Sequence, residues 1–412
     1  MEITLIIAAA VALSGVLILV LLSSSKYLTF FFFLCYTLPF LPLVAALGGF
    51  DSVFWPSETF SFKSSSIEVY GLALVWICSS LGMLTALAMV KRAHTMRLKP
   101  YIVKIRQSNC DMALSNSRVL RRILFTLLGG SVISRFLFHL EIEARFPGMD
   151  VFICYLFTVC WAIVLMTPRK KLFIQLSVIT GVYVFSQISS GDRDFFTFLF
   201  ALGLLWMVKR RLRFITLLKI VVASLILVIG GTAISMARMD IDFSLEQLQF
   251  FLAFNSWNAI ILPVLIMIGA EWQNGPFLFG KTYIDLLLSA FPSPIYYLLD
   301  FPKPITTDNP ANWFYIQGLG GMHFSGVALR NFGLIGVYLQ VMLFAFGLLV
   351  VERRVVKRNS GLRSLLFLVV AASVMHTTWY GLIYFINAMT FYISIVVLIY
   401  FFVLLRGIRQ KL

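Results

Sequence analysis

The sequence predicts an all-α integral membrane protein with about eleven transmembrane helices. The 412 residues are 60% hydrophobic and only 13% charged, a composition that excludes an ordinary soluble enzyme. Many apolar runs reach the roughly 20 residues needed to cross a bilayer. These runs are continuous and do not alternate with polar residues, which favours helices over a membrane β-barrel.

Each predicted span is an apolar run bounded by polar or basic residues. The first follows Met1 and Glu2 directly, without a basic n-region, so we expect a retained span and not a cleaved signal peptide. The predicted spans are 3–23, 27–49, 68–90, 119–139, 151–167, 172–188, 195–208, 214–235, 326–350, 364–383 and 387–405. The five cysteines mostly fall inside apolar runs without a CxxC pair, which indicates packed thiols.

The charged residues assign the two sides of the membrane. Basic residues cluster in alternate connections, such as 91–106, 209–213 and 352–358, and connections of this kind stay in the cytoplasm. Sorting by side places 26 of the 34 basic residues inside with only Asp111 and Glu352, and eight basic with 16 acidic residues outside. The N-terminus is therefore predicted outside and the C-terminus inside. The net charge of +16 is a topology signal, with some contact to membrane lipids, and no nucleic acid is expected as a partner.

One helical domain is predicted over 1–412, with a long extracytoplasmic loop at 236–325 between the eighth and ninth spans. Within this loop, 257–272 is short for a span and 282–299 contains prolines, so we expect both to be re-entrant or interfacial. A loop of this length either covers a binding site or has only a packing role.

The few basic residues on the outer side are the candidate binding groups. They are Lys63, Arg135, Arg145, Arg193, Arg238, Lys281, Lys303 and Arg330. Arg193 lies between Asp192 and Asp194 in SSGDRDFF (189–196), at the predicted N-terminus of the seventh span. Free N–H groups and a guanidinium suit a phosphate there, while the two carboxylates offset the unfavourable helix dipole and orient the arginine. A surface salt-bridge cluster is the alternative.

Other candidates are weaker individually. Arg238 follows the eighth span, where a cation also suits a helix C-terminus. Snorkelling or an ion pair explains Arg330, one turn inside the ninth span, as well as ligand binding does. Arg135 has Glu141 and Glu143 nearby in sequence and is expected to be structural.

His323, in GLGGMHFSG before the ninth span, has a side chain suited to proton transfer near neutral pH, although a lone His is more often structural. No two His residues have metal-ligand spacing. The DxD patterns Asp192/Asp194 and Asp240/Asp242 can hold a metal-bound sugar phosphate, but they are short and common, so metal binding is the less favoured interpretation. No metal or other cofactor is predicted.

Two stretches resemble the Wzy family of O-antigen and oligosaccharide repeat-unit polymerases. SSGDRDFFTFLFALGLLW (189–206) is similar to the stretch of that family in which a Gly/Ser-Arg turn opens a transmembrane helix. GLGGMHFSGVALRNFGLIGVYL (318–339) is similar to its Gly-rich outer segment leading into NFGxxG. The layout of 170–350 matches the family, and the remainder matches by hydropathy alone. Val327 and Leu329 stand where the family often carries a carboxylate, and an Arg common near the last spans is missing from 375–392.

The resemblance implies a metal-independent, inverting membrane glycosyltransferase at the outer face of the bacterial inner membrane. Donor and acceptor would be undecaprenyl-pyrophosphate-linked oligosaccharides, with a chain-length-regulating co-polymerase as a further partner. Arg193 and Arg238 would hold the pyrophosphate, with Asp192, Asp194, Lys281 and Arg330 in the substrate site. His323 would deprotonate or orient the acceptor hydroxyl.

Three alternatives remain open at the level of the sequence. An O-antigen ligase would use the same donor with a lipid A-core acceptor. A glycolipid flippase or transporter would normally carry midplane polar residues and repeated halves, neither of which is evident. The third alternative is a scaffold for polysaccharide assembly.

Overall fold

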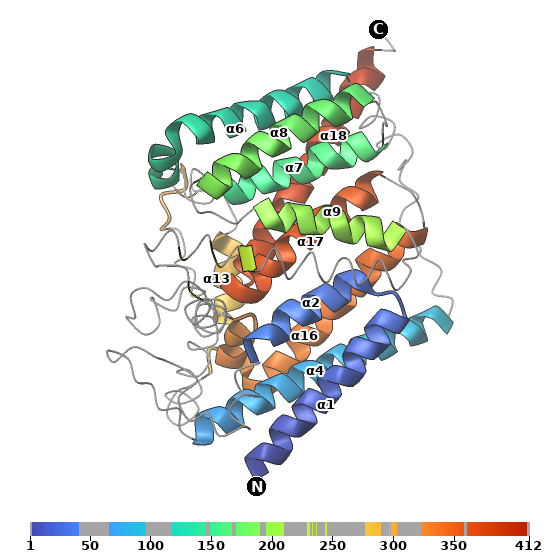
Figure 1. Cartoon of the computed structure of the whole chain (residues 1–412), viewed down its shortest axis with the longest axis vertical. Coiled ribbons are helices and arrows are strands. Elements are labelled where there is room, and N and C mark those ends of the chain that lie inside the picture. Colours follow the sequence, from blue (N-terminus) through green and yellow to red (C-terminus); the bar gives the residue numbers. More distant parts are fainter. Residues whose placement is uncertain are drawn as a thin grey trace. The chain divides into compact units, whose positions relative to one another are not determined.

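All secondary structure in the described part of the chain is helical (Figure 1), which confirms the predicted all-α class. The computed structural model describes residues 2–40, 66–95, 118–145, 149–166, 170–189, 195–209, 277–289, 298–302, 323–357 and 361–409, and single positions between 229 and 244 and at 296. Helices are the expected solution for these apolar runs, because a helix satisfies its backbone N–H and C=O groups internally.

The chain forms two compact units, each of which is described by itself. Unit 1 comprises Met1–Leu98, Asp242–Val350 and Val374–Asn387, and unit 2 comprises Lys99–Ile241, Val351–Ser373 and Ala388–Leu412. Three helices at the C-terminal end of the chain contribute residues to both units. They are α16 (Ser325–Lys357), α17 (Gly361–Tyr380) and α18 (Ile383–Arg409).

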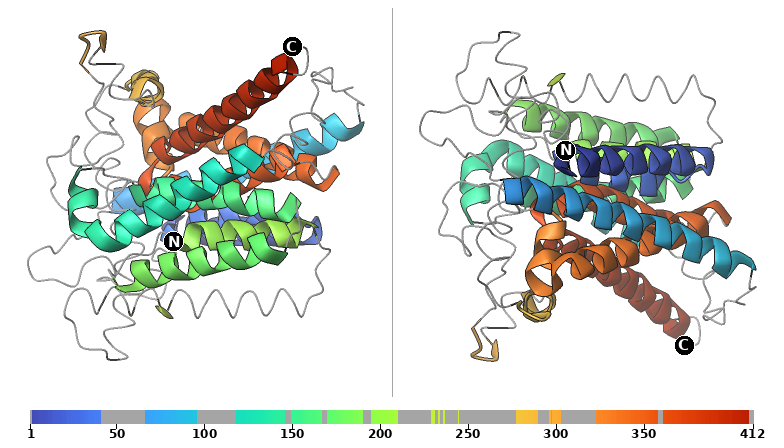
Figure 2. Two further views of the ribbon diagram at one scale, coloured as in Figure 1. Left: turned by 90° about the horizontal axis from the view of Figure 1, so that it is seen from above. Right: turned by 90° about the horizontal axis from the view of Figure 1, so that it is seen from below.

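Unit 1 also contains the N-terminal helices and one short helix from the predicted loop. These elements are α1 (Glu2–Ser23), α2 (Tyr27–Thr37), the 3₁₀ turn η1 (Leu38–Phe40), α4 (Ser66–Thr95) and α13 (Lys281–Ser289). Helix α1 lies along α4, as Figure 1 and the right view of Figure 2 show. Helices α4 and α16 approach closely at Gly82, where a Cβ would lie 2.5 Å from the carbonyl oxygen of Tyr338. The Tyr338 hydroxyl donates to Thr85 Oγ1 at 2.9 Å and holds the same crossing.

Unit 2 contains the four helices from the middle of the chain. They are α6 (Arg118–Arg145), α7 (Met149–Met166), α8 (Lys170–Ser189) and α9 (Phe195–Lys209). Helix α7 packs against α6, α8 and α9, and α6 also packs against α8. The part of α18 in this unit meets α7 through Phe391, whose ring centroid lies 5.5 Å from that of Tyr155.

The helices agree with the predicted spans in position, but fewer qualify as spans by length and composition. Each predicted span except 214–235, which lies almost wholly outside the described residues, overlaps a described helix. In the described part of the chain, six helices are long and apolar enough to cross a membrane. They are Thr4–Ser23, Tyr70–Arg92, Lys170–Ile188, Ser325–Val355, Gly361–Trp379 and Ile383–Phe401.

Three shorter apolar helices account for part of the difference. They are Tyr27–Phe40, Asp150–Leu165 and Phe195–Val208. The first changes to a 3₁₀ turn at Leu38, directly before Pro39, whereas the sequence predicts a continuous span over 27–49. Leu38 keeps helical dihedral angles (φ −50°, ψ −44°), but Pro39 has no N–H to continue the α-helical hydrogen bonding, so the regular helix ends here. Within the loop predicted at 236–325, α13 occupies the start of the apolar stretch 282–299, and 257–272 lies outside the described residues.

Candidate functional site at the start of helix α16

The NFGLIG stretch at 331–336 forms a kink inside α16. Phe332 (φ −141°, ψ 16°) and Gly333 (φ 61°, ψ −150°) leave the helical conformation. The positive φ of Gly333 favours glycine, and a Cβ there would also lie 3.2 Å from the Phe277 ring. A Cβ at Gly336 would come within 2.5 Å of the Ala328 carbonyl oxygen. Both glycines are therefore required by the local backbone, one for its dihedral angles and one for a close approach.

Asn331 joins this kink to the segment before α13. Its side chain is fully buried. Its Oδ1 accepts the N–H of Gly280 at 2.8 Å, and its Nδ2 donates to the Val327 carbonyl at 2.7 Å and to Thr282 Oγ1. One acceptor and two donor bonds use most of the hydrogen-bonding capacity of an amide side chain. Asn331 therefore acts as a clamp between α16 and residues 280–282.

Main-chain contacts reinforce the clamp. The N–H of Leu278 donates to the carbonyl of Arg330 at 3.3 Å, which ties the 278–281 turn to the residue before Asn331. Within the turn, the N–H of Lys281 donates to the Leu278 carbonyl at 3.0 Å. Lys281 is exposed and Arg330 is half-buried. Because hydrogen bonds join their immediate neighbours, these two predicted substrate-binding cations belong to one junction.

Gln340 makes a second connection on the same helix. Its Nε2 donates to the carbonyl of Phe324 at 2.6 Å, and its Oε1 accepts from the hydroxyl of Tyr283 in α13. The rings of Tyr283 and Phe332 also stack, with centroids 6.4 Å apart. The first turn of α13 and the residue preceding α16 are thus held by one side chain beyond the kink.

His323 directly precedes this segment and is fully buried. Its Nε2 lies 2.9 Å from the carbonyl oxygen of Tyr36, and its Nδ1 lies 2.7 Å from Ser325 Oγ. A carbonyl can only accept, so Nε2 carries the proton and Nδ1 accepts from the Ser325 hydroxyl. Burial lowers the pKa of His323 from 6.5 to about 4, although the bond to Tyr36 acts in the opposite direction. The ring is therefore neutral at pH 7.

Aromatic side chains fix the imidazole ring. Tyr36 and Phe40 both meet it edge-on, with centroids 4.4 Å and 5.0 Å from that of His323. Phe40 in turn stacks on Trp76 of α4 at 5.5 Å, and the Tyr36 hydroxyl bonds to Ser79 on the same helix. His323 thus has a defined position and one basic nitrogen, Nδ1, whose lone pair is engaged by Ser325.

The end of α17 that belongs to unit 1 supports the same segment. The carbonyl of Thr378 accepts the N–H of Phe324 at 2.9 Å, and Trp379 Nε1 donates to the carbonyl of Cys35 at 2.8 Å. The chain around His323 is consequently bonded to α17 as well as to α2. These contacts between distant parts of the chain could not be read from the sequence.

Several predicted site residues lie outside the described part of the chain. They are Asp192, Arg193, Asp194 and Arg238. Of the predicted set, the structure places Lys281 in the turn that is bonded to Arg330 and Asn331, and it places His323 two residues before the start of α16, with Tyr36 and Ser325 as its partners. Sequence reasoning missed Gln340, whose signal was a polar side chain inside an apolar run. Within the described residues, no group of three or more His, Cys, Asp or Glu side chains could hold a metal ion.

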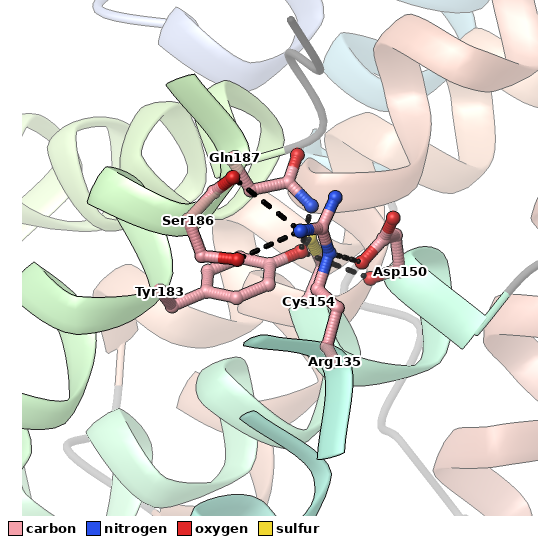
Figure 3. A network of polar contacts seen from close by, with 6 residues as sticks. All are labelled: Arg135, Asp150, Cys154, Tyr183, Ser186 and Gln187. Atoms are coloured by element: carbon pink, nitrogen blue, oxygen red, sulfur yellow. Dashed lines mark hydrogen bonds and ion pairs between the residues drawn. The ribbon is translucent and has the colours of Figure 1, made fainter. Parts of the chain in front are cut away.

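A second buried polar cluster lies in unit 2 and centres on Arg135 (Figure 3). Arg135 is 2% exposed, and its Nε forms an ion pair with Asp150 Oδ1 at 2.5 Å. Its Nη1 donates to Ser186 Oγ at 2.7 Å and to the Ser186 carbonyl at 3.4 Å. Arg135 was expected to have a structural role, and its ion pair with Asp150 on α7 is consistent with that role. Glu141 and Glu143, the acids nearby in sequence, lie on the same helix as Arg135.

Tyr183 extends the cluster along α8. Its hydroxyl donates to the main-chain carbonyl of Asp150 at 3.4 Å and accepts from Gln187 Nε2 at 3.1 Å. Cys154 Sγ lies 3.5 Å from the same hydroxyl. Figure 3 shows these side chains converging from α6, α7 and α8. Polar groups buried this deeply are stable only when they are paired.

The described part of the chain is all-helical, and six of its helices are long and apolar enough to cross a membrane, which indicates an α-helical membrane protein. No family model, curated protein or solved structure matches the chain. The site itself is therefore the basis for a functional assignment.

Proposed function

We propose that this protein is a membrane glycosyltransferase that polymerises lipid-linked oligosaccharide repeat units. The observation that carries the proposal is the NFGLIG stretch. Its Asn331, Gly333 and Gly336 each have a distinct structural role at the kink of α16. The stretch resembles the NFGxxG signature of the Wzy family and forms the kink of α16. Both features support a substrate site at the start of α16. Lys281 and Arg330 lie at the junction that the motif holds together, and His323 lies two residues before the start of α16.

The proposed substrates are two undecaprenyl-pyrophosphate-linked glycans. The acceptor sugar hydroxyl attacks the anomeric carbon of the donor, and the bond from that carbon to the pyrophosphate oxygen breaks. The bonding electrons leave with the pyrophosphate, so negative charge grows on it in the transition state. Arg193 and Arg238 stabilise this charge, with Lys281 and Arg330 as further cations. Direct attack inverts the configuration at the anomeric carbon.

His323 is proposed to accept the proton of the acceptor hydroxyl. The ring is neutral at pH 7, because burial lowers its pKa to about 4. Its free basic nitrogen, Nδ1, already accepts the Ser325 hydroxyl. The proton therefore moves to Nδ1 by way of Ser325, or directly after that hydroxyl rotates away. The Nε2 proton stays hydrogen-bonded to the Tyr36 carbonyl in both the neutral ring and the imidazolium cation that results.

The proposed topology follows the charge distribution. Eleven spans place the N-terminus outside, the C-terminus in the cytoplasm and the 236–325 loop on the outer face of the bacterial cytoplasmic membrane. The start of α16, with His323 and Arg330, would then face outward, where the lipid-linked units meet. Asp192 and Asp194 would orient Arg193 without binding a metal, and no cofactor is required.

The experiment is incubation of purified, reconstituted protein with labelled lipid-linked repeat unit as the sole substrate. A ladder of products spaced by one repeat unit is expected. If no ladder forms but a single transfer occurs when lipid A-core is added, the protein is a ligase. If the labelled lipid only changes leaflet without forming a new glycosidic bond, it is a flippase. Either of those results would overturn the polymerase proposal.

A further inference from the structure

We propose that residues 277–289 form a surface that inserts into the boundary between headgroups and acyl chains of the bilayer, with phospholipids as its partner. In this surface, Phe279 and the outward side chains of α13 lie among the acyl chains, and Lys281 lies at the lipid phosphates. The proposal concerns binding to the membrane and does not depend on the proposed transfer reaction.

The turn before α13 holds a phenylalanine in a conformation that is unfavourable for it. Phe279 (φ 44°) and Gly280 (φ 93°) both have positive φ, and the Lys281 N–H donates to the Leu278 carbonyl at 3.0 Å, which matches a type I′ turn. Glycine, asparagine and aspartate favour this turn, whereas a bulky side chain is strained in it. Phe279 is nevertheless 75% exposed, so burial within the protein does not offset the strain. Strain that the surrounding contacts maintain is a reason to expect a function for the residue.

Helix α13 turns its apolar side outward. Its buried side chains are Thr282, Leu286 and Ser289, two of which carry hydroxyl groups. Its most exposed side chains are Ile284 (60%), Leu287 (60%) and Leu288 (38%). The Thr282 hydroxyl accepts from Asn331 Nδ2, and the Ser289 hydroxyl donates to the Leu286 carbonyl at 2.7 Å. A helix at the surface of a protein in water has the opposite pattern, so the outward face of α13 requires an apolar surrounding.

The charged side chains of α13 lie along one edge of this apolar face. Lys281 is exposed and Asp285 is half-buried, and their spacing of four residues places them one turn apart on the same side of the helix. A helix with an apolar face and a charged edge lies in the plane of the interface. With nine residues, α13 is also far shorter than the roughly 20 residues needed to span the bilayer. Its shape therefore fits the boundary region and not the centre of the membrane.

The apolar surface continues from α13 onto α16, which identifies the partner as lipid. Helix α16 is long and apolar enough to cross a membrane. Its exposed side chains after the kink include Ile335 (72%), Leu339 (42%) and Leu343 (62%). Phe332 is itself 43% exposed, and its ring stacks on that of Tyr283 in α13. Phe332 lies about two turns from the start of α16 at Ser325, so the surface meets the helix near its end. Acyl chains that cover this part of α16 therefore also reach α13.

Lys281 defines the depth of the surface in the membrane. The aliphatic part of a lysine side chain can lie along apolar neighbours while its ammonium group reaches the lipid phosphates. An exposed lysine at this level is attracted to anionic lipids. The lysine directly follows the turn that presents Phe279. Phosphate contacts from Lys281 and acyl-chain contacts from Phe279 are therefore compatible with one lipid layer.

The experiment places the photoreactive residue p-benzoylphenylalanine at position 279 or 287 of the full chain, reconstituted in vesicles of phosphatidylcholine and phosphatidylglycerol in equal amounts. Excited benzophenone inserts into neighbouring C–H bonds, so a phospholipid adduct forms where acyl chains contact the side chain. The same residue at Leu339 gives the lipid reference, and at Ser24, which is exposed between α1 and α2, the aqueous reference. We expect adduct yields at both test positions of at least about half the Leu339 yield and at least about fivefold the Ser24 yield.

Two results would overturn the proposed surface. One is an adduct yield at positions 279 and 287 that is no higher than the yield at Ser24. The other is a crosslinked dimer as the main product, because a second copy of the chain would then cover the apolar face. The two positions come from the turn and from the helix, so the test remains decisive if one substituted chain does not fold.

The mass of the adduct at position 279 tests the placement of Lys281. Phosphatidylglycerol adducts should exceed phosphatidylcholine adducts by about threefold to fivefold. Lys281→Gln should bring the two yields close together without lowering their sum. Lys91→Gln, at an exposed lysine of α4, is the matched control and should leave the ratio unchanged. Equal yields of the two lipids with Lys281 present would overturn its placement at the phosphates.

Discussion

Substitution of Asn331 tests whether the clamp holds the 278–282 turn against α16. Asn331→Ala removes the partners of the Gly280 N–H and the Thr282 hydroxyl, which the wild-type side chain satisfies. A buried polar group left without a partner costs about 1–3 kcal/mol, so the two together cost about 2–4 kcal/mol if part of the loss is relieved by water. Since about 1.4 kcal/mol is tenfold in an equilibrium constant, the open form of the turn should become at least about 30-fold more populated.

Trypsin cleavage after Lys281 measures that population. Lys281 is exposed and begins α13, but a protease needs the backbone around it to open locally. When opening is fast relative to cleavage, the cleavage rate follows the open population. Reconstituted Asn331→Ala protein should therefore be cut at this site at least about 30-fold faster than wild type. Asn331→Asp keeps the acceptor for Gly280 and loses the Nδ2 donors, so it should lie between the two.

Two controls make the result specific. Lys281→Gln should abolish the fragment and identify the cut. Asn387→Ala changes an exposed asparagine and should leave the cleavage rate at the wild-type level. Equal cleavage of wild type and Asn331→Ala would refute the clamp.

Three further predictions concern the site and the topology. The folded pKa of His323 is lowered to about 4, so the unfolded chain binds more protons between pH 4 and 6.5. Thermal stability should therefore be constant above pH 7 and decrease as the pH falls through that window, and His323→Gln should flatten the decrease in a pH series of melts. Arg193→Ala should lower polymer formation at least about a hundredfold with normal insertion, Arg193→Lys should rescue it partly, and Arg238→Ala should resemble Arg193→Ala. A normal amount of polymer from Arg193→Ala would instead favour the alternative in which Arg193 only forms a surface salt bridge. Cysteine at Asp308 should be labelled from outside intact cells and cysteine at Arg353 should be protected; the reverse pattern would refute the topology.

The positions of helices were largely predictable from the sequence, because an apolar run of sufficient length has few alternatives to a helix in lipid. The predicted span 326–350 begins one residue after the observed start of α16 at Ser325. The kink inside it was not predicted. Glycine is tolerated within helices, and the positive φ of Gly333 is accompanied by a contact with Phe277 that no local pattern shows.

The partners of the candidate residues were not predictable, since they come from distant parts of the chain. His323 was identified from its place before a span, but its Nε2 partner Tyr36 is 287 residues away in sequence. The expected neighbours of Arg135 were the nearby acids on its own helix. The observed partner, Asp150, depends on the packing of α6 against α7, which periodicity does not determine.

The central claim, polymerisation without a metal, is tested most directly by the polymer yield of purified protein in excess EDTA. With lipid-linked repeat unit as the sole substrate, we expect a full ladder in EDTA and the same yield after Mg²⁺ or Mn²⁺ is added. Asp194→Asn should lower the yield modestly and create no metal dependence, because the carboxylate is proposed to orient Arg193. Complete loss of the ladder in EDTA, restored by either cation, would contradict the account and direct attention to Asp192 and Asp194 as metal ligands.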